Sequence, residues 1–295
     1  MLHERTLLVT LSLGLPPLQK TDKRITADIT AREGCQAGAL SAKKRLLPEH
    51  AIEAVKALDR EIGDYHHAHT LAWGDGTRIL RSLDFDAYAG EMRAFQHRRE
   101  SEALAFEARY DQFLWEARRI LNGAFNERDY LPVARIRSRF KFKLDFNPVP
   151  SASDWRLTVQ QECMDELRAG IERQTEAAIQ TAHADLARKI AEPLSKMVER
   201  LSEPEAVFRD TLVTNLREIC DLIPRLNITG DVAIDALRQR IYTDLYQHEP
   251  DTLRESSAVR ASTARKAQAI LDQMAGVFGS DAGLAEAAEP LAEAA

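Results

Sequence analysis

The sequence predicts a mainly helical protein with a small β element, arranged as an α+β head on a long antiparallel coiled-coil stalk. Of its 295 residues 44% are hydrophobic but only 6% are aromatic, which favours helices around a thin core of small and aliphatic side chains. Two long stretches with apolar residues at helical spacing, 84–121 and 154–201, flank one strongly alternating stretch, 135–146. Helices of similar length joined by a short excursion favour an antiparallel pair.

The first part of the chain supplies a strand and the smaller elements of the predicted head. Residues 5–13 alternate apolar and polar side chains, as a half-buried strand does. A short helix is expected within 24–40, and apolar residues at helical spacing predict a second helix over 48–65. The dipeptide Asp75-Gly76 is a turn signal that would join two short strands.

The two long helices form the predicted stalk. In the first, the charged run QHRRESE lies between apolar residues and would form a belt on the solvated side, and Asn122 and Gly123 would end the helix. In the second, Ser153 and Asp154 are candidate N-caps, and Pro193 should kink or break the helix.

Further helices are expected at 204–222, 231–247 and 251–277, with Pro224, Gly230 and Pro250 between them. The remaining residues contain no basic side chain and little to bury, so we expect a mobile acidic tail. The predicted organisation is a head (1–83 with 122–153), a stalk (84–121 with 154–201), C-terminal helices (202–278) and the tail (279–295).

Charge is divided unevenly along a chain whose formal net charge is -6. Residues 1–150 carry 24 Lys and Arg against 21 Asp and Glu, whereas residues 151–295 carry 16 against 25. The net positive charge of residues 1–150 is compatible with contact to nucleic acid. The opposite net charges of the two halves of the chain are equally compatible with association between copies. The overall negative charge argues against non-specific coating of DNA.

The most unusual stretch is ARIRSRFKFKLDF, residues 134–146, in which five cations occupy alternate positions. Alternate side chains of a strand point to the same side, so we expect these cations on one face, about 6.6 Å apart at a rise of ~3.3 Å per residue. The apolar residues between them would face the core. The predicted binding residues are Arg135, Arg137, Arg139, Lys141 and Lys143.

Three interpretations of this cationic stretch stay open. In the first, the stretch is the solvated outer face of a half-buried strand, or its charges are neutralised within the chain. In the second it binds a protein partner, which could be a second copy. In the third it binds a nucleic-acid backbone. Duplex DNA presents a phosphate about every 3.4 Å along each strand, so a row of cations could follow it. We favour the first two, because alternation alone fits an ordinary half-buried strand.

No motif in the sequence indicates catalysis. It has no glycine-rich phosphate loop, no nucleophile elbow, no zinc-protease motif and no dinucleotide fingerprint. His66, His67 and His69 lie close together, but the end of a helix favours histidines without a metal, and Asp84 and Asp86 suit the start of a helix. We expect no enzyme activity, no catalytic residue, no metal and no cofactor.

The cysteines and the hydropathy profile bear on the compartment. Cys35, Cys163 and Cys220 lie far apart without metal-ligand spacing, which predicts buried free thiols in a reducing cytoplasm. The apolar start of the chain has no signal-peptide cleavage site, and no run of 18 apolar residues predicts a membrane span. We expect a cytoplasmic protein without membrane contact.

Four stretches resemble a family of bacterial and phage proteins that is catalogued only as a domain of unknown function, number 3150. They are LLVTLSLGL, AKKRLLP, ARYDQFLWEARR and RIRSRFKFKLDF, in this order within residues 5–160, whereas NPVPSASDW does not fit the family. The resemblance implies a phage or mobile-element origin and neighbours of two kinds, a ring-forming ATPase of the MoxR type and a von Willebrand A-type protein. It implies no catalytic residue.

These observations favour a non-enzymatic cytoplasmic assembly or adaptor protein, in the host cytoplasm if a phage encodes it. It would act in a multiprotein complex, with the ring ATPase as a candidate partner. The alternative is a nucleic-acid-binding accessory protein that uses the cationic strand. Because the halves of the chain differ in sign of charge, we also expect a homo-oligomer that weakens with salt.

Overall fold

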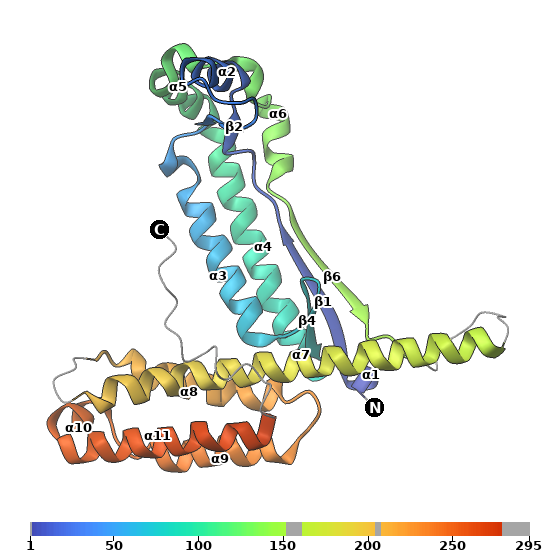
Figure 1. The fold of residues 1–295 in the computed structure, drawn as a ribbon, viewed down its shortest axis with the longest axis vertical. Coiled ribbons are helices and arrows are strands. Elements are labelled where there is room, and N and C mark those ends of the chain that lie inside the picture. The colour runs from blue at the N-terminus through green and yellow to red at the C-terminus, as the bar shows by residue number, and fades with distance from the viewer. Residues whose placement is uncertain (1, 152–160, 204–207, 279–295) are drawn as a thin grey trace. The chain divides into compact units, whose positions relative to one another are not determined.

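A computed structural model describes residues 2–151, 161–203 and 208–278, most of which are helical (Figure 1). The chain forms two compact units, each assembled from separate stretches. Unit 1 contains residues 1–10, 67–86 and 145–295, and unit 2 contains residues 11–66 and 87–144. The predicted class, mainly helical with a small β element, is confirmed. None of the helices that the structure describes combines the length and hydropathy of a membrane span.

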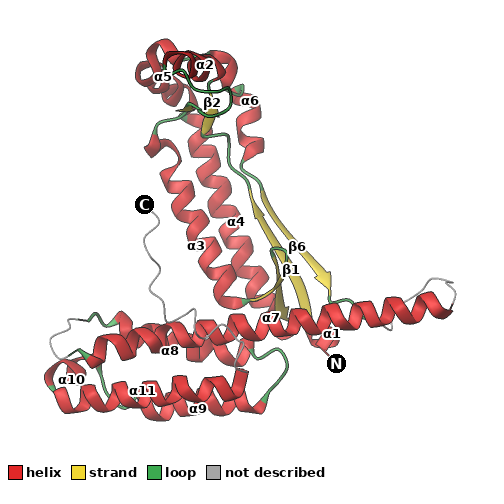
Figure 2. Ribbon diagram, in the orientation of Figure 1, coloured by secondary structure: helices red, strands yellow, loops and turns green. Residues whose placement is uncertain are grey.

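A four-stranded sheet in the order β4-β5-β1-β6 forms most of the β element (Figure 2). β1 pairs antiparallel with β5, and Asp75 and Gly76 join β4 to β5 with φ values of 49° and 74°. Positive φ at both central residues matches the twist of a hairpin, so the predicted turn is confirmed. On its other side β1 is the neighbour of β6 in this sheet. The strands are β1 (Thr6–Leu13), β4 (Leu71–Gly74), β5 (Thr77–Arg81) and β6 (Phe142–Pro148).

Unit 1 is built around the helix α7 (Gln161–Ser202), which packs against α8, α11 and β4. The buried side chains of α7 recur at helical spacing, and Leu186, Ile190 and Leu194 are fully buried in the core. α9 packs against α8 and α11 in the same core. The other helices of unit 1 are α1 (Leu2–Arg5), α8 (Thr211–Leu226), α9 (Val232–Leu245), α10 (Pro250–Glu255) and α11 (Ser257–Phe278).

A buried carboxylate links α7 to the sheet of unit 1. Asp185 accepts hydrogen bonds from the Ala72 amide at 3.0 Å and from the Arg78 guanidinium at 2.8 Å. Burial raises the pKa of Asp185, but the Lys189 ammonium, the Ala72 amide and Arg78 outweigh burial and lower that pKa. The ionised carboxylate therefore fixes how the sheet lies on α7.

Unit 2 is built on an antiparallel helix pair, α3 (Glu53–His69) and α4 (Phe85–Ala108). Glu61 of α3 pairs with Arg98 of α4, and Tyr65 packs on Phe95, so later residues of α3 meet earlier residues of α4. The remaining elements of unit 2 are β2 (Gln19–Thr21), α2 (Lys23–Arg32), β3 (Lys43–Arg45), α5 (Tyr110–Leu121) and α6 (Val133–Ile136).

Several predicted helix bounds are wrong. Residues 84–121 form two helices, because Arg109 leaves helical geometry and α5 turns Tyr110 and Phe113 into the core that also holds Phe106. The segment 251–277 is likewise divided at Ser256 into α10 and α11. Pro224 lies inside α8, and α7 continues through Pro193, because tertiary packing of both helices outweighs the local cost of proline.

The predicted coiled-coil stalk of residues 84–121 and 154–201 is not confirmed. Within unit 2 the antiparallel partner of α4 is α3, and within unit 1 α7 packs on α8 and α11. The bounds of the two units also differ from those of the predicted head and stalk. The predicted N-caps Ser153 and Asp154 and the predicted tail 279–295 lie outside the described residues.

Candidate cationic binding site

The stretch predicted as one strand, residues 135–146, is helical in its first part. It contains the end of α6 and a 3-10 turn over Arg137–Arg139, and β6 begins only at Phe142. Alternate residues of a helix lie about 200° apart around its axis, so the first three cations do not share one face. The predicted single-faced row of charges is therefore wrong. We define residues 135–143 as the cationic segment.

A tight turn joins the helical part of the cationic segment to β6. Phe140 has φ -79° and ψ 69°, and the Lys141 amide donates to the Arg139 carbonyl at 2.9 Å. These are the dihedrals of an inverse γ-turn, which is common at the ends of strands. On the inner side Ile136 is buried, and Phe140 packs edge-on against Phe106 at 5.1 Å between ring centroids. The two apolar residues hold the segment on the core of unit 2 and leave its cations outside.

Gly14 contacts the backbone of the cationic segment through a hydrogen bond. Its amide donates to the carbonyl of Lys141 at 2.8 Å. A Cβ atom at position 14 would lie 3.0 Å from the carbonyl oxygen of Arg139 and 3.0 Å from the Cβ of Lys141. Such contacts are tighter than nine in ten of those that real Cβ atoms make, so a larger residue at position 14 would require the neighbouring backbone to shift by a few tenths of an ångström.

Arg99 of α4 ties the same two backbone segments to α3. Its side chain is only 2% exposed. The guanidinium donates to the Asp59 carboxylate at 2.6 and 3.2 Å, to the Gly14 carbonyl at 2.7 Å and to the Lys141 carbonyl at 3.0 Å. A buried charge is tolerated when it is paired and hydrogen-bonded in this way. The prediction of a solvated belt over QHRRESE thus holds for Arg98 and is wrong for Arg99.

All the predicted binding residues have exposed side chains: Arg135, Arg137, Arg139, Lys141 and Lys143. Among the residues that the structure describes, no ion pair involves the first four of them. Their charges repel one another, and water, counter-ions or an acidic partner must screen that repulsion. The surface therefore favours a negatively charged ligand.

Other cations of unit 2 are neutralised inside the fold. Lys44, 9% exposed, lies 2.8 Å from Asp22 and 2.7 Å from Asp129, and Lys20 also bonds Asp129. Burial lowers the pKa of Lys44, but its bonds to Asp129 and Asp22 outweigh burial and raise that pKa. Unit 2 carries 21 Lys and Arg against 16 Asp and Glu, and two of these carboxylates, Asp22 and Asp129, are paired with lysines outside the cationic segment.

An exposed aromatic residue on α5 adds a second feature to unit 2. Trp115 is 57% exposed, and the Arg119 guanidinium lies over its ring, 4.8 Å from the centroid. Exposed aromatic rings combined with arginine are used to stack on bases of single-stranded nucleic acid. Trp115 was not among the residues that the sequence pattern indicated.

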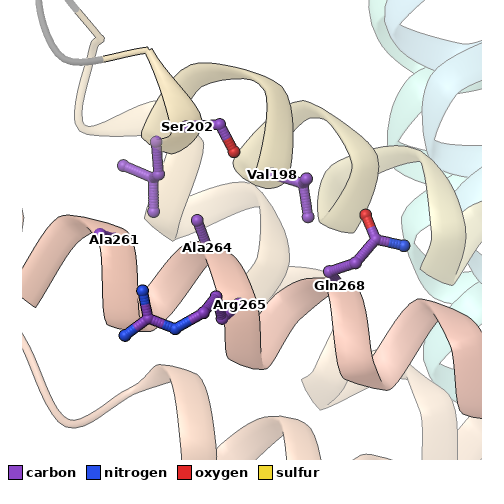
Figure 3. Close-up of a pocket in the computed structure, with 7 residues that line it drawn as sticks. Val198, Ser202, Ala261, Ala264, Arg265 and Gln268 are labelled. Atoms are coloured by element: carbon purple, nitrogen blue, oxygen red, sulfur yellow. The ribbon is translucent and has the colours of Figure 1, made fainter.

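A shallow hollow of about 350 Å³ lies between α7 and α11 of unit 1 (Figure 3). Arg265 is the one ionisable side chain among its lining residues, and Ser202 is the one hydroxyl. A serine nucleophile needs a neighbouring base, and the lining supplies none. The lining residues that the structure describes therefore contain no acid–base pair. Its lining is Val198, Leu201, Ser202, Ala261, Ala264, Arg265 and Gln268.

Histidine and cysteine residues do not converge in the described part of the chain. There, no group of three His, Cys, Asp or Glu side chains could hold a metal, and His66 is buried with Nδ1 2.6 Å from the Tyr88 hydroxyl. Cys220 is buried as predicted, and burial raises the pKa of its thiol. Cys35 is exposed, contrary to prediction, because it follows the end of α2 in a surface turn. The side chain of Cys163 lies outside the described residues.

Comparison of the chain with protein-family models, curated proteins and solved structures finds no match. The geometry of unit 2 nevertheless separates two roles among its residues. The five predicted cations form the exposed surface, and Gly14 and Arg99, which the sequence pattern did not indicate, form its support. The only sequence signal for Gly14 was a turn after the first strand, and nothing distinguished Arg99 from its exposed neighbour.

Proposed function

We propose that this chain is a non-enzymatic adaptor that binds a negatively charged protein surface through the cationic segment and acts in a multiprotein complex. The observation that carries the proposal is a set of four exposed cations, without an ion pair among the described residues, on a backbone held by Gly14 and Arg99. A surface whose backbone is already ordered loses little conformational entropy when a partner docks. The segment is thus suited to binding.

The wider setting of this adaptor follows from the family resemblance. It would work in the cytoplasm, or in the host cytoplasm if a phage encodes it, beside a ring ATPase of the MoxR type. Self-association would let one copy connect several partners. The opposite charges of unit 1 (19 Lys and Arg against 30 Asp and Glu) and unit 2 support such connections.

Nucleic acid is the second candidate ligand of the cationic segment. Trp115 with its stacked Arg119 is the observation that favours it, because it adds an exposed ring to a basic unit. In that case binding would depend strongly on salt. Removal of one cation that binds a phosphate would reduce the magnitude of the slope of log affinity against log salt concentration by about 0.9 for duplex DNA or about 0.7 for single strands.

A triple substitution tests the proposed function. We expect Arg137→Gln, Arg139→Gln and Lys141→Gln together to abolish the salt-dependent self-association of the chain. The circular dichroism spectrum should stay unchanged, since these side chains are exposed. The matched control removes three exposed cations of α3 and α4 that form no ion pair within the described residues, with the same change of charge: Lys56→Gln, Arg60→Gln and Arg93→Gln.

Sedimentation velocity at about 50 and about 200 mM salt measures association, and fluorescence anisotropy with labelled single-stranded and duplex DNA measures the alternative. If association disappears in the segment variant and persists in the control, the adaptor is supported. If DNA binding disappears in the same pattern, the nucleic-acid function is supported. If the segment variant behaves as the wild type in both assays, the cationic segment is only a solvated surface.

A further inference from the structure

The first turns of α7 form a helical arm that the other helices of unit 1 leave uncovered. In Figure 1 they extend beyond α8, α9 and α11. None of the side chains described between residues 165 and 177 is buried, and the first buried residue of α7 is Ala178. From Ala182 onward α7 lies in the core of unit 1. We define residues 161–177 as the α7 arm.

The α7 arm has little to stabilise it as an isolated helix. Even alanine-rich helices need roughly 12–15 residues to be marginally stable in water, and most helices in proteins depend on a packed face. Gly170 in the middle of the arm weakens it further. Leu167 is 41% exposed. Continuity with the packed part of α7 removes the cost of nucleation, but it buries none of the side chains described between residues 165 and 177. An arm of this kind is suited to being covered by a partner.

The charge of the α7 arm is opposite to that of the cationic segment. The arm carries five carboxylates against Arg168 and Arg173, whereas residues 135–143 carry five cations and no carboxylate. At 100° per residue Asp165, Glu172 and Glu176 fall within about 40° of one another around the helix axis. Three of the five acidic side chains of the arm thus lie in a line along one face, and Asp165 among them also lies 3.6 Å from the guanidinium of Arg168 on the same helix.

The spacing of the charges also agrees. Glu172 and Glu176 are four helical residues apart, a rise of about 6 Å. Arg135 and Arg139 are four residues apart in α6 and the following 3-10 turn, a rise of about 6–7 Å. Two carboxylates and two guanidinium groups at matching spacing can form two charge-assisted pairs at once, and arginine can bind each carboxylate through two donors.

We infer that the acidic face of the α7 arm docks on the cationic segment of a second copy of this chain, an interface that rests on the proposed function of the segment. The two surfaces are different, so the contact is heterologous: each bound copy still offers one free arm or one free segment. Repetition therefore forms a ring if the rotation closes, or an open chain if it does not. Charge complementarity of the two uncovered surfaces identifies the second copy as the occupant.

A charge-swap experiment tests this inference. The segment variant carries Arg135→Glu, Arg137→Glu and Arg139→Glu, and the arm variant carries Asp165→Lys, Glu172→Lys and Glu176→Lys. Alone, each variant has two surfaces of like charge, so its association at about 50 mM salt should be at least about tenfold weaker than that of the wild type. Mixed in equal amounts, the variants again offer opposite charges between arm and segment, and association should return.

The control variant Lys56→Glu, Arg60→Glu and Arg93→Glu changes the charge of unit 2 equally and should associate as the wild type does. Sedimentation velocity measures the mass of each sample, and circular dichroism checks that the exposed substitutions leave the helices intact. At about 1 M salt, where the Debye length is about 3 Å, the association of the wild type and of the mixture should disappear.

Three outcomes would overturn the inference. If the arm variant associates as the wild type does while the segment variant does not, the segment binds another acidic surface and the proposed function stands without this interface. If the mixture stays monomeric, the two surfaces are not partners. If the wild type is monomeric and the swaps change only its frictional ratio, the arm and the segment pair within one chain.

Discussion

Replacing Arg99 by Met tests whether a buried guanidinium supports the cationic segment. Methionine has a similar helix propensity and keeps an unbranched apolar stem, but it lacks the five N–H donors of arginine. The substitution leaves the Asp59 carboxylate, whose side chain is 16% exposed, without its ion-pair partner. It also removes the donor to the carbonyl groups of Gly14 and Lys141.

The expected destabilisation can be worked out from these interactions. Removing one partner of a buried ion pair costs about 3–5 kcal/mol, and a buried carbonyl left without a donor costs about 1–3 kcal/mol. Asp59 keeps some contact with water, and the Lys141 carbonyl still accepts from the Gly14 amide at 2.8 Å. We therefore expect the free energy of unfolding of unit 2 to fall by about 3–5 kcal/mol in total, a large effect for one substitution.

Urea unfolding followed by circular dichroism measures this change, and hydrogen exchange of the Lys141 amide reports locally on the segment. The matched control is Arg98→Met, because Arg98 donates two hydrogen bonds of 2.8 Å to Glu61 from the next position of α4. That pair is about half exposed, so water replaces it and the change should be much smaller. Equal destabilisation in both variants would refute a supporting role for the buried guanidinium.

Three further predictions concern unit 2. Burial raises the pKa of Asp129, but hydrogen bonds from Lys20 and Lys44 outweigh it and hold that pKa below its ordinary 3.8. The stability that the Asp129 carboxylate contributes is complete above the carboxyl pKa of the unfolded chain and is lost as the pH falls through the lower folded pKa. In Lys44→Met the free energy of unfolding should therefore depend less steeply on pH below about pH 4. Burial raises the pKa of Tyr130 to about 12, and its buried hydroxyl has no hydrogen-bond partner among the described residues. Tyr130→Phe should therefore keep or raise the melting temperature, and a fall of several degrees would contradict this. Gly14→Ala should cost about 1–3 kcal/mol in urea unfolding, because the new Cβ meets backbone; wild-type stability would show that the segment can move away.

Features that depend on neighbouring residues in the chain were predictable. The hairpin turn at Asp75 and Gly76 follows from backbone chemistry, because few residue pairs adopt positive φ at both positions. The helical stretches of unit 1 follow from apolar residues that recur at helical spacing over many turns. The mainly helical class was predictable for the same reason.

Features that depend on distant residues were not predictable. Arg98 and Arg99 are identical neighbours in the sequence, yet one is exposed and the other is almost fully buried. The difference arises because Arg99 faces Asp59 and the carbonyl groups of two segments distant in sequence. The break between α4 and α5 likewise reflects the core that Tyr110 and Phe113 of α5 enter.

The cationic segment combines a feature that was predictable from the sequence with one that was not. Its composition established that cations would be exposed and apolar residues buried, because that separation follows from solvation in a strand or a helix. Its conformation was ambiguous, since Ile136 and Phe140 are four residues apart, and this spacing places two side chains on one side of either element. Only the core around Phe106, together with the close contact at Gly14, selects the helical form. The placement of the charges was therefore decided by tertiary packing, which a local alternation of residues does not contain.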